Sequence, residues 1–140
     1  MKRAGFLTAV LAAAVWIGCD GIVGADEDNF VFDSIRVNYD SAMVDNAEAF
    51  SLLRNIQVDG LILLPHACHT VGGNYSRTGG QITLTVTANA TSTTCTAAIT
   101  PMQYRLQTFG MPSGAYRLRV YHQFGSAQRV LIAEQDLVVG

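Results

Sequence analysis

Histidine and cysteine side chains lie close together in the segment His66-Ala67-Cys68-His69. Imidazole nitrogens and a thiolate are ligands for zinc and copper, so metal binding is the first chemistry that this spacing suggests. In an extended segment, however, His66 and Cys68 would share one face and His69 would point away. The segment also lacks the Cys-x-x-Cys-His order of a haem attachment site. We therefore predict that these residues hold no metal and no other cofactor.

A second cysteine, Cys19, ends a short apolar run at the start of the chain. The run follows the basic residues Lys2 and Arg3 and extends to Gly18. A membrane-spanning helix needs roughly 20 apolar residues, whereas a secretory signal needs fewer and has this charged start. We predict that residues 1–18 are a signal peptide.

The end of this run, Trp16-Ile17-Gly18-Cys19, resembles the lipobox of bacterial lipoproteins. Ile17, Gly18 and Cys19 fit that pattern, and Trp16 stands where a small aliphatic residue is usual. The resemblance implies cleavage before Cys19, a diglyceride on Cys19, and attachment to a membrane of the bacterial cell envelope, on its periplasmic or surface face. An alternative cleavage site, Val23-Gly24-Ala25, would release a secreted soluble chain that starts at Asp26.

Once Cys19 carries lipid, Cys68 and Cys95 remain as an even pair in an exported chain. Exported proteins meet an oxidising compartment in which disulfides form and persist. We predict a disulfide between Cys68 and Cys95. This bond would also take the sulfur of Cys68 away from any metal.

No arrangement of nucleophile, base and acid stands out elsewhere in the chain. The candidate bases are His66, His69 and His122, and no Gly-x-Ser-x-Gly elbow accompanies them. The glycine pairs at 72–73 and 79–80 precede no helix or lysine that would complete a phosphate-binding loop. The formal net charge is −2, without a basic cluster for nucleic acid. We predict a protein that is neither an enzyme nor a nucleic-acid binder.

Alternating apolar and polar residues predict strands after a short tether. Residues 19–29 are rich in Gly, Asp and Glu and form the predicted lipidated tether, and residues 30–140 form the predicted domain. The clearest alternation lies at 81–89 and 115–124. Further strands are expected at 30–39, 58–64, 95–99, 104–109 and 129–139, with a loop at 72–80. Residues 41–55 fit a short helix as well as a strand and turn.

Seven or eight short strands with Gly, Pro and Asn between them indicate an all-β protein with an antiparallel β-sandwich. The segment at 112–120, PSGAYRLRV, resembles the penultimate strand of immunoglobulin-like and prealbumin-like domains of bacterial surfaces. That resemblance implies that Tyr116 makes a tyrosine-corner hydrogen bond to the preceding turn. Such domains share an architecture and not a function.

The leading hypothesis is a membrane-anchored, non-catalytic interaction or structural module of the envelope with a protein or glycan partner. Arg105, Arg117 and Arg119 would form a basic patch for an anionic glycan or acidic partner if their strands are neighbours. The alternatives are a small-ligand or metal carrier that uses His66 and His69, and an inhibitor or accessory subunit of an exported enzyme.

Overall fold

The computed structural model describes residues 28–140, which form eight strands and no helix. The expected strand at 81–89 is confirmed, and residues 41–55 contain a strand and turn instead of a helix. No helix able to cross a membrane occurs within residues 28–140. The strands are β1 (Asn29–Arg36), β2 (Asn46–Leu52), β3 (Asn55–His66), β4 (His69–Thr78), β5 (Gln81–Ala90), β6 (Ala97–Phe109), β7 (Gly114–Phe124) and β8 (Val130–Val139).

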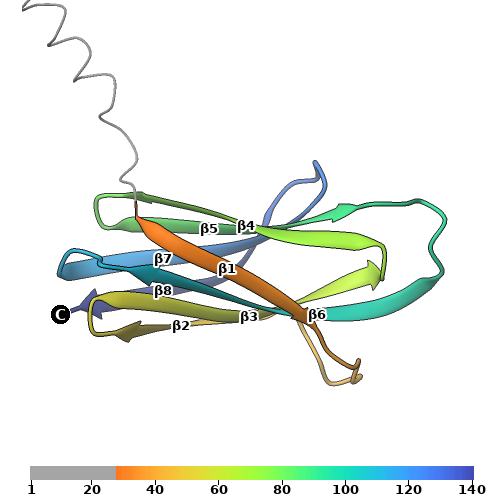
Figure 1. Cartoon of the computed structure of the whole chain (residues 1–140), viewed down its shortest axis with the longest axis horizontal. Coiled ribbons are helices and arrows are strands. Elements are labelled where there is room, and N and C mark those ends of the chain that lie inside the picture. The colour runs from red at the N-terminus through yellow and green to blue at the C-terminus, as the bar shows by residue number, and fades with distance from the viewer. Residues whose placement is uncertain (1–27) are drawn as a thin grey trace, which may run out of the picture.

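The strands form two four-stranded sheets that pack face to face (Figure 1). One sheet has the order β1-β6-β3-β2 and is antiparallel throughout. The other has the order β4-β5-β7-β8, in which β5 and β7 are parallel and the other pairs are antiparallel. The predicted all-β sandwich is confirmed, with one parallel pair inside it.

The core is built by the alternation that the sequence predicts. In β5 the apolar residues Ile82, Leu84 and Val86 are buried, while the intervening threonines face away from the core. In β7 the same parity buries Tyr116, Leu118, Val120 and His122. These residues face apolar side chains of the opposite sheet, chiefly Ile56, Val58, Ile62, Leu64 and Leu106.

The predicted tyrosine corner is present. The Tyr116 hydroxyl donates a hydrogen bond to the carbonyl oxygen of Pro112 at 2.6 Å. Its ring is buried at the start of β7, so the bond fixes the turn that leads into this strand.

The expected loop at 72–80 is wrong, because residues 69–78 form β4 and only Gly79-Gly80 turns the chain. Gly73 lies under the ring of Phe32, and a Cβ atom at this position would be 2.4 Å from that ring. The glycine therefore allows β1 and β4 to approach each other across the sandwich edge.

The two strands expected at 95–99 and 104–109 are one long strand, β6, which runs through Pro101. The carbonyl oxygen of Pro101 accepts a hydrogen bond from Val37 N, so the backbone polar atoms of Pro101 face the β1 side of the strand. β1 ends at Arg36, opposite Met102. The missing N–H of Pro101 therefore removes no hydrogen bond to β3, and the strand continues.

A buried ion pair holds the residue that precedes β1. Asp28 accepts hydrogen bonds from Arg77 Nε at 2.7 Å, from Arg77 NH2 at 3.0 Å and from the Tyr75 hydroxyl at 2.6 Å. The side chains of Asp28 and Arg77 are 5% and 10% exposed. β1 begins at Asn29, directly after Asp28. The predicted signal peptide and most of the tether, including Cys19, lie outside the described residues.

The edge strands β2 and β8 close one side of the sandwich. The Gln135 side chain accepts a hydrogen bond from Ala49 N at 3.2 Å and donates one to Ala49 O at 2.8 Å. One amide side chain thus satisfies both backbone groups of Ala49 as a neighbouring strand would.

Candidate functional site

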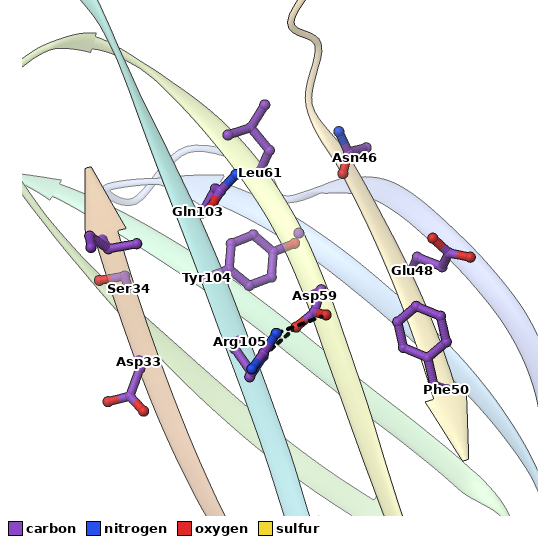
Figure 2. Close-up of a pocket in the computed structure, with 12 residues that line it drawn as sticks. Asp33, Ser34, Asn46, Glu48, Phe50, Asp59, Leu61, Gln103, Tyr104 and Arg105 are labelled. Carbon is purple, nitrogen blue, oxygen red and sulfur yellow. Dashed lines mark hydrogen bonds and ion pairs between the residues drawn. The ribbon is translucent and has the colours of Figure 1, made fainter. Parts of the chain in front are cut away.

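A groove crosses the outer face of the β1-β6-β3-β2 sheet (Figure 2). Its volume is about 600 Å³, and all four strands contribute to it. It is lined by Asp33, Ser34, Ile35, Asn46, Glu48, Phe50, Asp59, Gly60, Leu61, Gln103, Tyr104 and Arg105. Because alternate residues of a strand share a face, the charged residues of this list point away from the core.

One row of four charged residues runs straight across the groove. The strand register places Asp33 opposite Arg105, Arg105 opposite Asp59, and Asp59 opposite Glu48. Arg105 Nε donates to Asp59 Oδ1 at 2.7 Å, and this hydrogen bond and the charge of Asp59 raise the pKa of the guanidinium. Asp33 and Glu48 have no hydrogen-bond partner among residues 28–140. The row therefore carries three carboxylates and a single guanidinium.

Apolar and amide side chains flank this row. On one side the register aligns Ile35, Gln103, Leu61 and Asn46, and on the other side Phe50 stands next to Gln57. Ile35 and Phe50 are exposed. The groove thus combines an excess of negative charge with apolar contact area at both margins.

The condition for a basic patch, that the strands of Arg105, Arg117 and Arg119 are neighbours, is not met. Arg105 lies on the β1-β6-β3-β2 sheet, whereas Arg117 and Arg119 lie on β7 in the other sheet. Arg117 pairs with Asp136 at 3.0 Å, and Arg119 pairs with Glu134 at 2.5 Å. The carboxylates of β8 neutralise these arginines, so no concentrated positive charge results.

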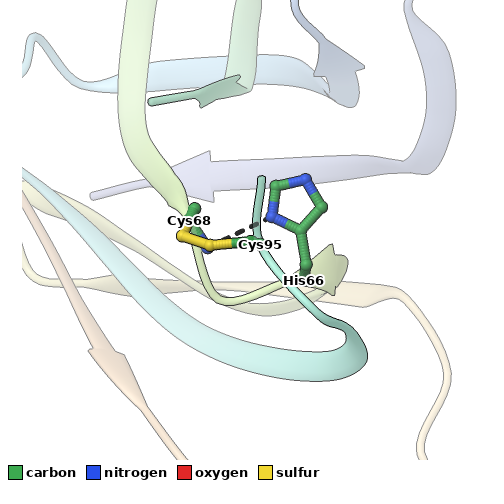
Figure 3. A group of neighbouring side chains, drawn as sticks. All are labelled: His66, Cys68 and Cys95. Atoms are coloured by element: carbon green, nitrogen blue, oxygen red, sulfur yellow. Dashed lines mark hydrogen bonds between the residues drawn. A yellow bond between two sulfur atoms is a disulfide. The ribbon is translucent and has the colours of Figure 1, made fainter. Parts of the chain in front are cut away.

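The disulfide between Cys68 and Cys95 is present (Figure 3). It lies near the end of β6 that pairs with His66, whereas β1 begins at the other end of β6, opposite Phe109. The two Cα atoms are 6.1 Å apart. Cys68 lies in the corner between β3 and β4, and Cys95 lies in the loop before β6. The bond therefore ties that corner to the long connection between the two sheets.

The two histidines beside the disulfide lie closer together than they would in the extended segment that we expected. His66 ends β3 and His69 begins β4, so the chain turns between them and their ring centroids are 4.2 Å apart. His66 Nδ1 accepts a hydrogen bond from Cys68 N at 3.2 Å, and His69 Nδ1 lies 3.1 Å from His66 O. Ligand atoms of His66, Cys68 and Cys95 lie within 4.8 Å of one another, but the disulfide occupies both sulfurs.

A buried polar network joins the two sheets and was missed in the sequence. The Tyr104 hydroxyl lies 2.8 Å from His122 Nε2, and His122 Nδ1 lies 3.0 Å from Asp45 Oδ2. His122 is 2% exposed, and burial raises the pKa of Tyr104. A Cβ atom at Gly60 would come within 2.3 Å of the Tyr104 hydroxyl oxygen. The hydroxyl is therefore enclosed between Gly60 and His122, where it holds the sheets together.

Comparison with known proteins supports the architecture. The model of one protein family, the ORF11 beta-sandwich domain, matches residues 59–127, from the middle of β3 to the turn after β7. The chain is a β-sandwich. No curated protein and no solved structure matches it. The similarity to this family covers Asp59, Gln103 and Arg105 of the groove and leaves Asp33 and Glu48 outside it.

Proposed function

We propose that this protein is a non-catalytic interaction module of the bacterial cell envelope, anchored by lipid at Cys19, that binds a protein partner in the groove. The supporting observation is the row of Asp33, Arg105, Asp59 and Glu48 across the outer sheet face. Two of its carboxylates have no partner within the described part of the chain. A partner segment with arginine or lysine side chains complements this charge.

The form of the groove favours a protein segment over a small ligand. Its floor is a sheet face that stays open to solvent across four strands, and it has apolar margins at Ile35 and Phe50. Such a surface offers lateral contacts along an extended or hairpin segment, whereas small-molecule sites enclose most of their ligand.

The anchor is tested by the intact mass of the native protein purified from membranes, measured before and after reduction. We expect a chain that starts at an acylated Cys19 and gains two mass units on reduction of the Cys68–Cys95 bond. A chain that starts at Asp26 without acyl groups would contradict the anchor and leave the groove proposal standing.

The groove is tested by reversing its charge. The double variant Asp33→Arg, Glu48→Arg is expected to lose cross-linked partner from envelope preparations by about tenfold or more, because opposite charges across an interface become like charges. Thr87→Arg, on the outer face of β5, is the matched control and should retain the partner. Equal recovery of the partner by the wild type and the double variant would contradict this site. An equal loss of the partner in the Thr87→Arg control would also contradict it.

A further inference from the structure

The turn between β2 and β3 presents a leucine in an unfavourable backbone conformation. Leu52 pairs with Asn55, which leaves Leu53 and Arg54 as a two-residue connection. Leu53 has φ = 54° and is the one non-glycine residue with positive φ in the described chain. Hairpins usually place glycine at such a position, because a Cβ atom is strained there. The Leu53 side chain is nonetheless 88% exposed.

The surrounding backbone holds this turn in place. The carbonyl oxygen of Arg54 accepts a hydrogen bond from Met111 N at 2.9 Å, and Asn55 Oδ1 accepts one from Gly110 N at 3.2 Å. The turn is thus fixed against the connection between β6 and β7, and the leucine projects outward. These hydrogen bonds keep Leu53 in a strained conformation with its side chain in solvent, and strained positions of this kind cluster at functional sites.

Leu53 is one of several exposed apolar side chains at this end of the sheet, which we call the tip patch. In the end row of the β1-β6-β3-β2 sheet, Leu52 pairs with Asn55 and Phe109 pairs with Asn29. In the next row Phe50 pairs with Gln57 and Val31 pairs with Gln107, so polar side chains lie between the apolar ones. Alternation along each strand places these apolar residues on the outer face, and all of them are exposed. The tip patch therefore consists of Val31, Leu52, Leu53 and Phe109, and Phe50, in the same row as Val31, remains the margin of the groove.

The tip patch lies at the end of the sandwich where the described chain begins (Figure 1). Asn29 pairs with Phe109, and the preceding Asp28 is held by Arg77. Eight residues separate Cys19 from Asp28, and the nine steps between these two Cα atoms span at most about 30 Å. A lipid on Cys19 would thus hold this end of the domain near the bilayer surface.

We infer that the tip patch inserts into the interface of the membrane that carries the Cys19 lipid, with Leu53 deepest and Arg54 at the lipid phosphates. This inference rests on the proposed anchor. Apolar side chains gain by leaving water, and an interfacial element reaches about 5–10 Å into the headgroup and acyl boundary. The charged row of Asp33, Asp59 and Glu48 lies one row beyond Phe50 and limits the depth, because burial of carboxylates is unfavourable.

Two-point attachment would orient the domain. A lipid on a tether permits rotation, whereas the lipid and the tip patch together fix one end of the sheet on the bilayer. The groove would then stand beside the membrane surface with its charged row parallel to it.

The chain offers a clean reporter for this contact. Trp16 is the only tryptophan, and signal removal leaves the mature chain without one. Leu53→Trp keeps a Cβ atom at the strained position and adds a fluorophore at the tip. Leu131→Trp, at an exposed position near the start of β8 and away from the tip patch, is the control. Both lipidated proteins are reconstituted into phosphatidylcholine vesicles with and without brominated acyl chains, and flotation measures membrane attachment.

We expect both proteins to float and only the position 53 reporter to show blue-shifted emission and quenching by brominated lipid. Floating protein whose position 53 emission matches that of position 131 would overturn the inserted tip and keep the anchor. Blue-shifted emission without bromine quenching would also overturn it, since residues 20–27 or a second copy would then cover the patch. Protein that fails to float would overturn both proposals.

Discussion

Replacing Arg77 with methionine is expected to destabilise the domain by about 3 kcal/mol, because it leaves the carboxylate of Asp28 buried without its cation. Arg77 contacts both oxygens of Asp28, at 2.7 and 3.0 Å, and also donates to Gly79 O. The measurement is urea unfolding of the wild type and the variant, compared as free energies of unfolding.

Arg105→Met is the matched control for this change. Arg105 also pairs with an aspartate at 2.7 Å, but both side chains of that pair are exposed. Exposed ion pairs contribute little, so the control should unfold at nearly the same urea concentration as the wild type. A similar decrease in the free energy of unfolding in both variants would show that burial of the Asp28–Arg77 pair adds nothing to its contribution to stability.

The same pair predicts how stability depends on pH. The hydrogen bonds and charge of Arg77 hold the pKa of Asp28 below its ordinary value. The contribution of Asp28 is therefore fully present above the pKa of an unfolded aspartate, about 3.9, and is lost as the pH falls through the lower pKa of the folded state. The slope of unfolding free energy against pH in this acidic range should be smaller in Arg77→Met.

Loss of the Cys68–Cys95 disulfide is the second change with a large expected effect. The bond joins residues 27 positions apart, and the chain-entropy estimate for a loop of this size is about 3 to 4 kcal/mol. The double variant Cys68→Ala, Cys95→Ala should unfold at a lower urea concentration than the oxidised wild type. Reduction should lower the stability of the wild type and leave that of the variant unchanged. A wild type whose unfolding is insensitive to reduction would contradict the prediction.

Alternation along single strands made much of the fold predictable. Alternate residues of β7 face inward, as Tyr116, Leu118 and Val120 show, and the same alternation turns His122 into the core. The burial of this histidine could therefore be predicted from the sequence. Its partners could not be predicted in the same way, because Asp45 precedes β2 and Tyr104 lies in the other sheet. Contacts between sheets depend on register, which a single strand does not encode.

The incorrect expectations came from residues whose local preference was overridden by packing. Gly73 suggests a loop in the sequence, although a small residue is needed there because Phe32 lies against it. Pro101 separates the two strands expected at 95–99 and 104–109, although it lies within β6 just beyond the last residue of β1. The charged row of the groove was also invisible in the sequence, because Asp33, Glu48, Asp59 and Arg105 become neighbours only through strand pairing.

The parallel pairing of β5 with β7 has a consequence for how the domain acquires its structure. A parallel pair cannot form a local hairpin, and the chain between these strands must first cross to the other sheet as β6. Domains dominated by such non-local pairings generally fold slowly, over about milliseconds to seconds. The β4–β5 and β2–β3 hairpins can assemble early, but β8 and its Gln135 can close the sandwich only after almost the whole chain is available. During that interval the apolar faces of the early hairpins remain open to other unfolded chains.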